Sequence, residues 1–107
     1  MIKINLSRFR GNGSKIFSGR DRGIKARTEL KLNDLDNNDE IVNVIIPKDT
    51  WSINSSFFGG LFESSVIKLH DEGFKKKYRF KLDDGSELND ELQRNVDECI
   101  FETLNDI

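Results

Sequence analysis

The feature that most constrains the fold of this chain is a short run of β-branched residues. The run Ile41–Ile46 contains only one polar residue and ends at Pro47, a pattern typical of a strand in the centre of a sheet. Downstream, apolar residues recur at steps of three and four, which places them on one face of a helix from about Ser55 to Leu69. These residues are Phe58, Leu61, Phe62, Val66 and Leu69. A buried strand followed by an amphipathic helix predicts an α/β fold.

The remaining elements follow from periodicity. Alternation of apolar and polar residues predicts half-buried strands at 2–6 and 77–82, and residues 20–32 have the composition of a helix. A last helix begins near Ser86 or Asn89 and presents one apolar face. That face consists of Leu88, Leu92, Val96, Cys99, Ile100 and Thr103. We therefore expect an α/β sandwich in which amphipathic helices cover a small mixed sheet.

Turn-forming residues predict where these elements end. Gly11-Asn12-Gly13 tolerates positive φ and is expected to join a hairpin to a strand at 15–17. The acidic segment 33–40 is expected to be an exposed connection, and Gly73 to end the helix that precedes it.

Length and composition restrict the class of protein. The 107 residues are expected to form one domain, 1–107. The chain contains no apolar stretch long enough to span a bilayer, no apolar signal-peptide core and a single cysteine, so we expect a cytoplasmic protein. His70 and Cys99 have no companions at metal-ligand spacing, and no metal site is expected.

Charge is unevenly distributed along the chain. The first 31 residues hold nine Lys or Arg and two Asp or Glu, a net charge of +7 in a chain whose total is −2. This asymmetry indicates either a basic binding face or attraction between the two parts within the fold.

A polar corner, Asn54-Ser55-Ser56, lies where the predicted sheet gives way to a helix. Unpaired N–H groups and the positive end of the helix dipole favour a cap, an anion or a phosphorylated hydroxyl at such a place. Either serine acting only as a helix cap is the simpler alternative.

This corner resembles the signature of STAS domains, the family of anti-sigma-factor antagonists, which reads Asp-Ser-Ser-Gly-Leu-Gly. Asn54 stands at the position of the Asp, Ser55 and Ser56 match the hydroxyl positions, and Gly59 matches the second glycine. A serine followed by Phe57, together with the stretch Gly19–Gly23, is more similar to a divergent STAS-like branch.

The resemblance implies a STAS-like sandwich fold and a non-enzymatic regulatory role in binding another protein. Ser56 would be the phosphoacceptor for a GHKL-type kinase or ATPase partner that holds the nucleotide, so this chain would need no cofactor. Phosphorylation would add nearly two negative charges at the binding surface. The residues expected to contact the partner are Asn54, Ser55, Ser56, Phe57, Gly59 and Gly60.

Three neighbouring features extend this hypothesis. Phe57 is out of phase with the apolar stripe of its helix, so we expect either an exposed anchor at an interface or a residue that packs the loop onto the sheet. The pair Gly59-Gly60 is expected to permit close approach of the sheet or of a partner. Arg20 and Arg22, flanked by glycines, are candidates to clamp a phosphate or carboxylate, although a solvated helix start has the same composition.

Two other classes of function compete with a regulatory domain. A nucleic-acid or phosphate-binding module would use the basic N-terminal third, and basic residues alternate with Tyr78 and Phe80 on the strand 77–82 as on surfaces that stack single strands. An enzyme is not expected, because the chain has no Gly-x-Ser-x-Gly turn, Walker-type loop or dinucleotide fingerprint.

Overall fold

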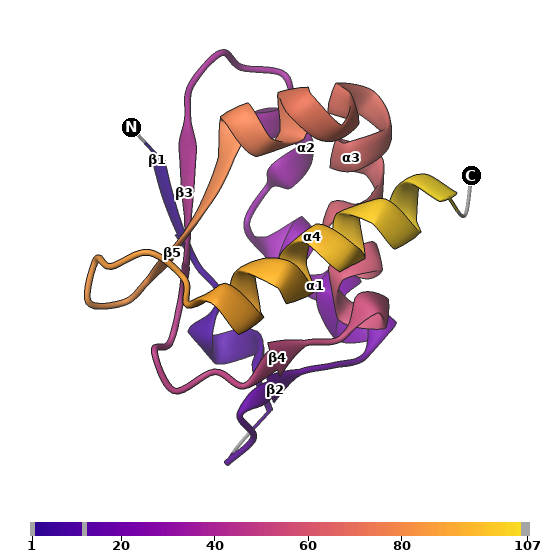
Figure 1. The fold of residues 1–107 in the computed structure, drawn as a ribbon. Coiled ribbons are helices and arrows are strands. Elements are labelled where there is room, and N and C mark those ends of the chain that lie inside the picture. Colours follow the sequence, from indigo (N-terminus) through magenta and orange to yellow (C-terminus); the bar gives the residue numbers. More distant parts are fainter. Residues whose placement is uncertain (1, 12, 106–107) are drawn as a thin grey trace.

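The computed structural model describes residues 2–11 and 13–105, and its centre is a three-stranded sheet (Figure 1). The strands β1 (Ile2–Asn5), β3 (Val42–Ile46) and β5 (Tyr78–Leu82) lie in the order β1-β3-β5. The β-branched run therefore forms the central strand, as predicted. Both pairings are parallel, so the prediction of a mixed sheet is wrong. The reason is that the connection between each pair of neighbouring strands contains a helix. This helix returns the chain to the end of the sheet at which the previous strand began, so the next strand runs in the same direction.

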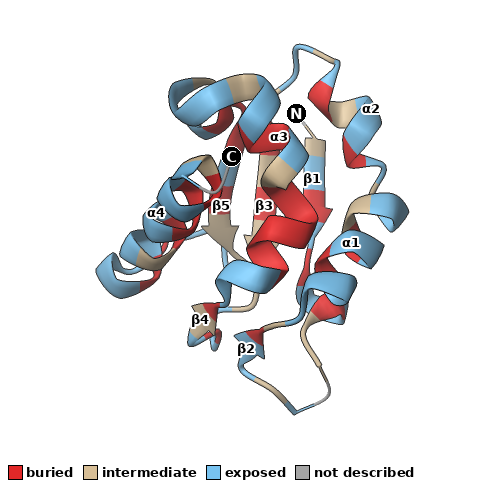
Figure 2. Cartoon of the chain, turned by 90° about the vertical axis from the view of Figure 1, so that its right-hand side faces the viewer, coloured by how far each residue is buried: buried red, intermediate tan, exposed pale blue. Residues whose placement is uncertain are grey.

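The helices α1 (Arg20–Glu29), α2 (Leu32–Asp36), α3 (Ser55–Lys77) and α4 (Asp90–Asn105) all lie on one face of this sheet (Figures 1 and 2). Right-handed crossovers that advance in one direction across a sheet place their helices on the same side. The strand side chains alternate accordingly. Val42, Val44 and Ile46 are buried beneath the helices, whereas no helix of the described residues covers the opposite face.

A second, two-stranded sheet lies below the first. Its strands β2 (Ile16–Phe17) and β4 (Ser52–Ile53) are also parallel, and N–H groups of Trp51 and Asn54 extend the pairing to the carbonyls of Lys15 and Phe17, at 2.7 Å each. The predicted hairpin between the first two strands is therefore wrong, because β2 pairs with β4. In the expected turn, the Ser14 N–H donates to Gly11 O at 3.0 Å; Asn12 lies outside the described residues.

The helix boundaries differ from prediction at two places. Residues 20–32 are not one helix, because Lys31 adopts a left-handed conformation (φ 57°) and interrupts it. A second helix, α2, begins at Leu32 and continues to Asp36, into the segment 33–40 that was expected to be a connection. Gly73 does not end its helix, since α3 continues to Lys77. The predicted end at Leu69 coincides instead with a kink at His70 (φ 62°, ψ 179°).

Aromatic side chains fill the core between the helices and the sheet. Phe62 is at the centre of this cluster, with its ring centroid 5.0 Å from that of Phe74 and 5.2 Å from that of Tyr78. The predicted apolar face of the last helix is confirmed in α4, where Leu92, Val96, Cys99, Ile100 and Thr103 are all buried. Leu88 is also buried, but it precedes the first residue of α4.

Candidate functional site

The polar corner lies on the surface at the N-terminus of α3. Asn54 is the N-cap residue, with extended backbone (φ −71°, ψ 143°). Its Oδ1 accepts hydrogen bonds from the Ser56 N–H at 2.9 Å and from the Ser56 hydroxyl at 2.7 Å. The cap is thus supplied by Asn54 and not by either serine. Asn54, Ser55 and Ser56 are exposed.

Phe57 is not exposed, so of the two alternatives left open by its phase, the exposed anchor is wrong and the packing residue is supported. Its side chain is fully buried, and its ring centroid lies 5.1 Å from that of Phe17 in β2. The physical reason is that α3 is the central helix and packs against α1, α4 and β5, so several of its faces are covered. The exposed aromatic of this region is Trp51, at 70% exposure.

The adjacent glycines Gly59 and Gly60 of α3 serve the packing of α1 rather than of the sheet or of a partner. A Cβ atom on Gly60 would lie 2.3 Å from the Arg20 carbonyl oxygen, and one on Gly23 would lie 2.3 Å from the Phe57 carbonyl oxygen. Gly59 and Gly60 are both buried. The pair therefore permits close approach, as expected, but the approaching element is a neighbouring helix of the same chain.

This helix contact brings Arg20 to the serine corner. A hollow of about 190 Å³ is lined by Arg20, Ser55, Ser56, Gly59, Glu63, Glu102 and Thr103. Arg20 forms an ion pair with Glu63 in this hollow. Arg22 does not join it, because its guanidinium lies beside Gly11 and donates to Ser18 O at 3.4 Å. The two arginines therefore do not form one clamp.

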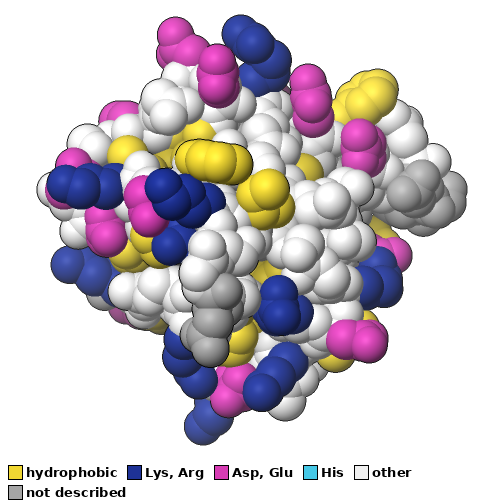
Figure 3. All heavy atoms as spheres, turned by 90° about the horizontal axis from the view of Figure 1, so that it is seen from below, with side chains coloured by type: hydrophobic (Ala, Val, Ile, Leu, Met, Phe, Trp, Pro, Cys, Tyr) yellow, Lys and Arg dark blue, Asp and Glu magenta, His cyan; other side chains and the backbone are white. Residues whose placement is uncertain are grey.

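The end of the molecule below α3 carries apolar and basic side chains next to one another (Figure 3). Ile16 of β2 is exposed there, and so is Trp51, which directly precedes β4. The Lys15 ammonium lies 5.5 Å from the centre of the Trp51 ring. Arg10 donates to Asp49 at 2.7 Å, and this hydrogen bond lowers the pKa of the Asp49 carboxyl.

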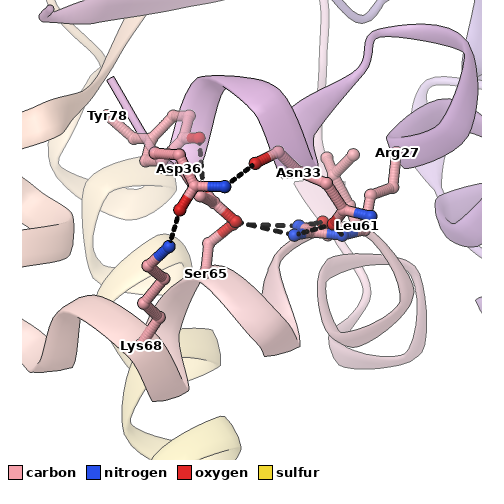
Figure 4. A network of polar contacts seen from close by, with 8 residues as sticks. Arg27, Asn33, Asp36, Leu61, Ser65, Lys68 and Tyr78 are labelled. Atoms are coloured by element: carbon pink, nitrogen blue, oxygen red, sulfur yellow. Dashed lines mark hydrogen bonds and ion pairs between the residues drawn. The ribbon is translucent and has the colours of Figure 1, made fainter. Parts of the chain in front are cut away.

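A buried polar network, which the sequence analysis missed, connects α1, α2, α3 and β5 (Figure 4). At its centre, the Asp36 carboxylate accepts from Arg27 at 2.7 Å, from the Ser65 hydroxyl at 2.7 Å and from the Tyr78 hydroxyl at 2.5 Å. Arg27 also donates to Leu61 O at 2.9 Å. Asp36 is four residues after Leu32 in α2, and that spacing was the available signal that it faces inward.

The groups of this network satisfy one another. Burial and the neighbouring Asp36 carboxylate raise the pKa of Tyr78 above its ordinary value, so its phenol remains a donor. Among the described residues, no buried side-chain nitrogen or oxygen lacks a hydrogen-bond partner. We therefore interpret the network as a structural connection between helices.

Intramolecular ion pairs connect three of the nine basic residues of the N-terminal third to the rest of the chain. Arg10 pairs with Asp49, Arg20 with Glu63 and Arg27 with Asp36. Each pair joins the basic third to the acidic remainder, which favours attraction within the fold over a free basic face. The predicted stacking strand is also wrong in its aromatic part. Tyr78 and Phe80 point into the core, and only the basic residues of β5 face away from the helices.

Other kinds of site receive little support from the described residues. They contain no group of three or more His, Cys, Asp and Glu side chains placed to hold a metal ion. Burial raises the pKa of the Cys99 thiol to about 12. Within the same part of the chain, no helix combines the length and apolar character of a bilayer span.

Comparisons of this chain with models of protein families, with curated proteins and with solved structures found no match. The resemblance of Asn54–Ser56 to the STAS signature stays a prediction.

Proposed function

We propose that this chain is a non-enzymatic regulatory domain that binds another protein, similar to an anti-sigma-factor antagonist of the STAS family. Its binding surface would consist of Trp51, Asn54, Ser55 and Ser56, which we call the α3 surface. The observation that carries this proposal is the exposed Ser56 hydroxyl at the N-terminus of α3, where Asn54 holds it at 2.7 Å. Phe57, Gly59 and Gly60 would support this surface from beneath, because they are buried.

Trp51 would anchor the partner. Large aromatic residues that become buried on binding contribute most of the affinity at many interfaces. Trp51 is 70% exposed, and Lys15 lies beside its ring. A partner with an apolar pocket bordered by acidic groups would match both side chains.

Phosphorylation of Ser56 would switch this surface. A GHKL-type kinase partner would transfer the γ-phosphate of its own ATP to the Ser56 oxygen. The Ser56 hydroxyl would lose its proton in this step, and ADP would remain on the partner. The phosphate would add about −1.5 to −2 charges at a helix N-terminus, where the dipole favours an anion. Arg20 lines the same hollow as Ser56 and could exchange Glu63 for the phosphate, whereas Glu63 and Glu102 would be repelled.

The test uses a candidate partner, the GHKL-type ATPase encoded nearest to this gene. Phosphate incorporation from labelled ATP is expected with the wild type and with Ser64→Ala, but not with Ser56→Ala. Ser64 is a suitable control because it is an exposed serine of the same helix. Equal labelling of all three proteins would refute Ser56 as the acceptor.

Binding of the same partner tests the surface separately from the phosphate. We expect Ser56→Asp and Trp51→Ala to change the affinity by about tenfold or more, and Ser64→Asp to leave it unchanged. If neither of the first two substitutions alters the affinity, the α3 surface is not the binding site.

A further inference from the structure

The strand β5 is an edge strand with unpaired backbone groups. The Asp83 N–H donates to Ile46 O of β3 at 2.9 Å, whereas the Leu82 N–H points the other way and donates to Ser86 O at 2.9 Å. Since alternate residues of a strand direct their N–H and C=O groups to the same side, Phe80 presents both groups on the side away from β3. No strand of the described residues lies on that side.

A groove with a mixed apolar and charged lining runs beside this edge. It has a volume of about 400 Å³ and lies between β5 and α4. Its apolar lining is the buried floor of the groove and consists of Phe74, Tyr78, Phe80, Val96 and Ile100, whereas its walls are charged. The groove is therefore placed to receive side chains from a segment that pairs with Phe80.

The other side of the same edge is basic. Arg79 and Lys81 alternate with Phe80, so their Cβ atoms lie on the helix-free face of the sheet. Both residues also line the groove, where Lys81 forms an ion pair with Glu87. The register places Arg79 in one row with Asn43 and Lys3. Lys75 and Lys76 also line the groove, and Lys75 forms ion pairs with Asp71 and Asp97. Among the described residues, Lys76 and Arg79 are the basic residues of the groove that form no ion pair, and they give this edge its excess positive charge.

We propose that the edge of β5 binds an extended, acidic segment of a partner protein as a fourth strand. Side chains of a strand alternate between the two faces of a sheet. One set of the segment's side chains would be apolar and would enter the groove between β5 and α4. The other set would be acidic and would lie next to Arg79 and Lys81.

The edge accepts only a short segment. At one end, the Tyr78 N–H already donates to Phe74 O, and at the other end Leu82 donates to Ser86 O. Pairing is therefore centred on Phe80. A second copy of this chain is a poor occupant, because its own β5 would set Arg79 and Lys81 against the same basic residues, and like charges on neighbouring strands repel.

Selection from a phage-displayed library of random octapeptides on the full chain tests this proposal. We expect enrichment of sequences that alternate Asp or Glu with Val, Ile or Phe. A synthetic copy of the enriched peptide should bind more weakly as salt increases, and it should slow hydrogen exchange of the Phe80 amide.

Substitutions on α4 locate the site. Gln93 is exposed and lines the groove, so Gln93→Trp should fill it and weaken peptide binding by about tenfold or more. Glu91→Trp is the matched control, since Glu91 is an exposed residue of the same helix outside the groove. Arg79→Glu should weaken the binding of acidic peptides but not the binding of the same peptides with lysine in place of the acidic residues.

Three results would overturn the proposal. They are a library that yields no alternating acidic sequence, an enriched peptide that binds wild type and Gln93→Trp equally, and a wild-type dimer that Gln93→Trp converts to monomer. The last would make a second copy the occupant. Ser56 and Trp51 do not line this groove, so these results leave the proposed function of the α3 surface untouched.

Discussion

Gly23 of α1 and Gly60 of α3 each occupy a position where a side chain would collide with the backbone of the other helix. A Cβ atom at either residue would lie 2.3 Å from a carbonyl oxygen of the opposing helix. The two helices therefore touch through their backbones. This contact holds Arg20 at the hollow that contains Ser55 and Ser56.

The first prediction follows from this contact. Gly60→Ala should lower the free energy of unfolding by about 1–3 kcal/mol, because the added methyl overpacks a backbone contact, although alanine favours a helix. Urea denaturation measures this change. Gly59→Ala is the control, since its nearest neighbour is the mobile end of Arg20, and it should be close to neutral. Equal stability of the two variants would contradict the assigned packing.

Asp36 is the residue on which the buried network depends. Asp36→Asn should lower the free energy of unfolding by about 3–5 kcal/mol, because Arg27 would lose its buried counter-charge. Asp34→Asn, an exposed substitution in the same helix, should change it by less than about 0.5 kcal/mol. If denaturation curves give both variants the same free energy of unfolding, Asp36 is not buried as described.

Tyr78 predicts loss of stability at high pH. Its pKa is raised in the folded chain, so above about pH 10 the unfolded chain loses the phenol proton first. The stability that this group contributes is complete below pH 10 and is lost as pH rises further, by at most about 1.4 kcal/mol per pH unit.

Tyrosinate absorbance measures this effect directly, because Tyr78 is the sole tyrosine of the chain. The absorbance should appear only as the protein unfolds. Tyr78→Phe should show a shallower decline of unfolding free energy above pH 10, and the contribution of Cys99 cancels between the two proteins. An ordinary tyrosinate titration in the folded protein would contradict the buried phenol.

The cap of α3 gives a fourth prediction. Asn54→Ala should cost about 1 kcal/mol of stability, because the Ser56 N–H would lose its acceptor. Ser55→Ala should cost little, since Ser55 does not cap the helix. Thermal unfolding of the two variants compares them. A larger loss of stability in Ser55→Ala than in Asn54→Ala would contradict the assignment of Asn54 as the cap.

The elements that were predicted correctly are those whose buried residues follow one regular pattern along the sequence. The run Ile41–Ile46 has the β-branched composition of a central strand, and α4 buries a single face. Both therefore agree with their local sequence patterns. The phase of Phe57 left two alternatives open, and Phe57 is buried because α3 is covered on several sides, so that a residue out of phase with one face contacts another. Periodicity cannot report such a tertiary arrangement.

The polar part of the structure was harder to foresee. Asp36 lies in a run of Asp and Asn whose composition is typical of a connection, yet its carboxylate becomes buried because Arg27, Ser65 and Tyr78 converge on it from three other elements. The Asn54–Ser56 corner was placed at a helix N-terminus because capping chemistry is local. Its neighbour Arg20 depends on how two helices cross.

The pairing of β2 with β4 has a mechanical consequence. β2 leads directly into α1 and β4 into α3, and backbone hydrogen bonds of Trp51 and Asn54 clasp the two strands together. Displacement of either strand would therefore also act on the other strand and on the first turns of both helices.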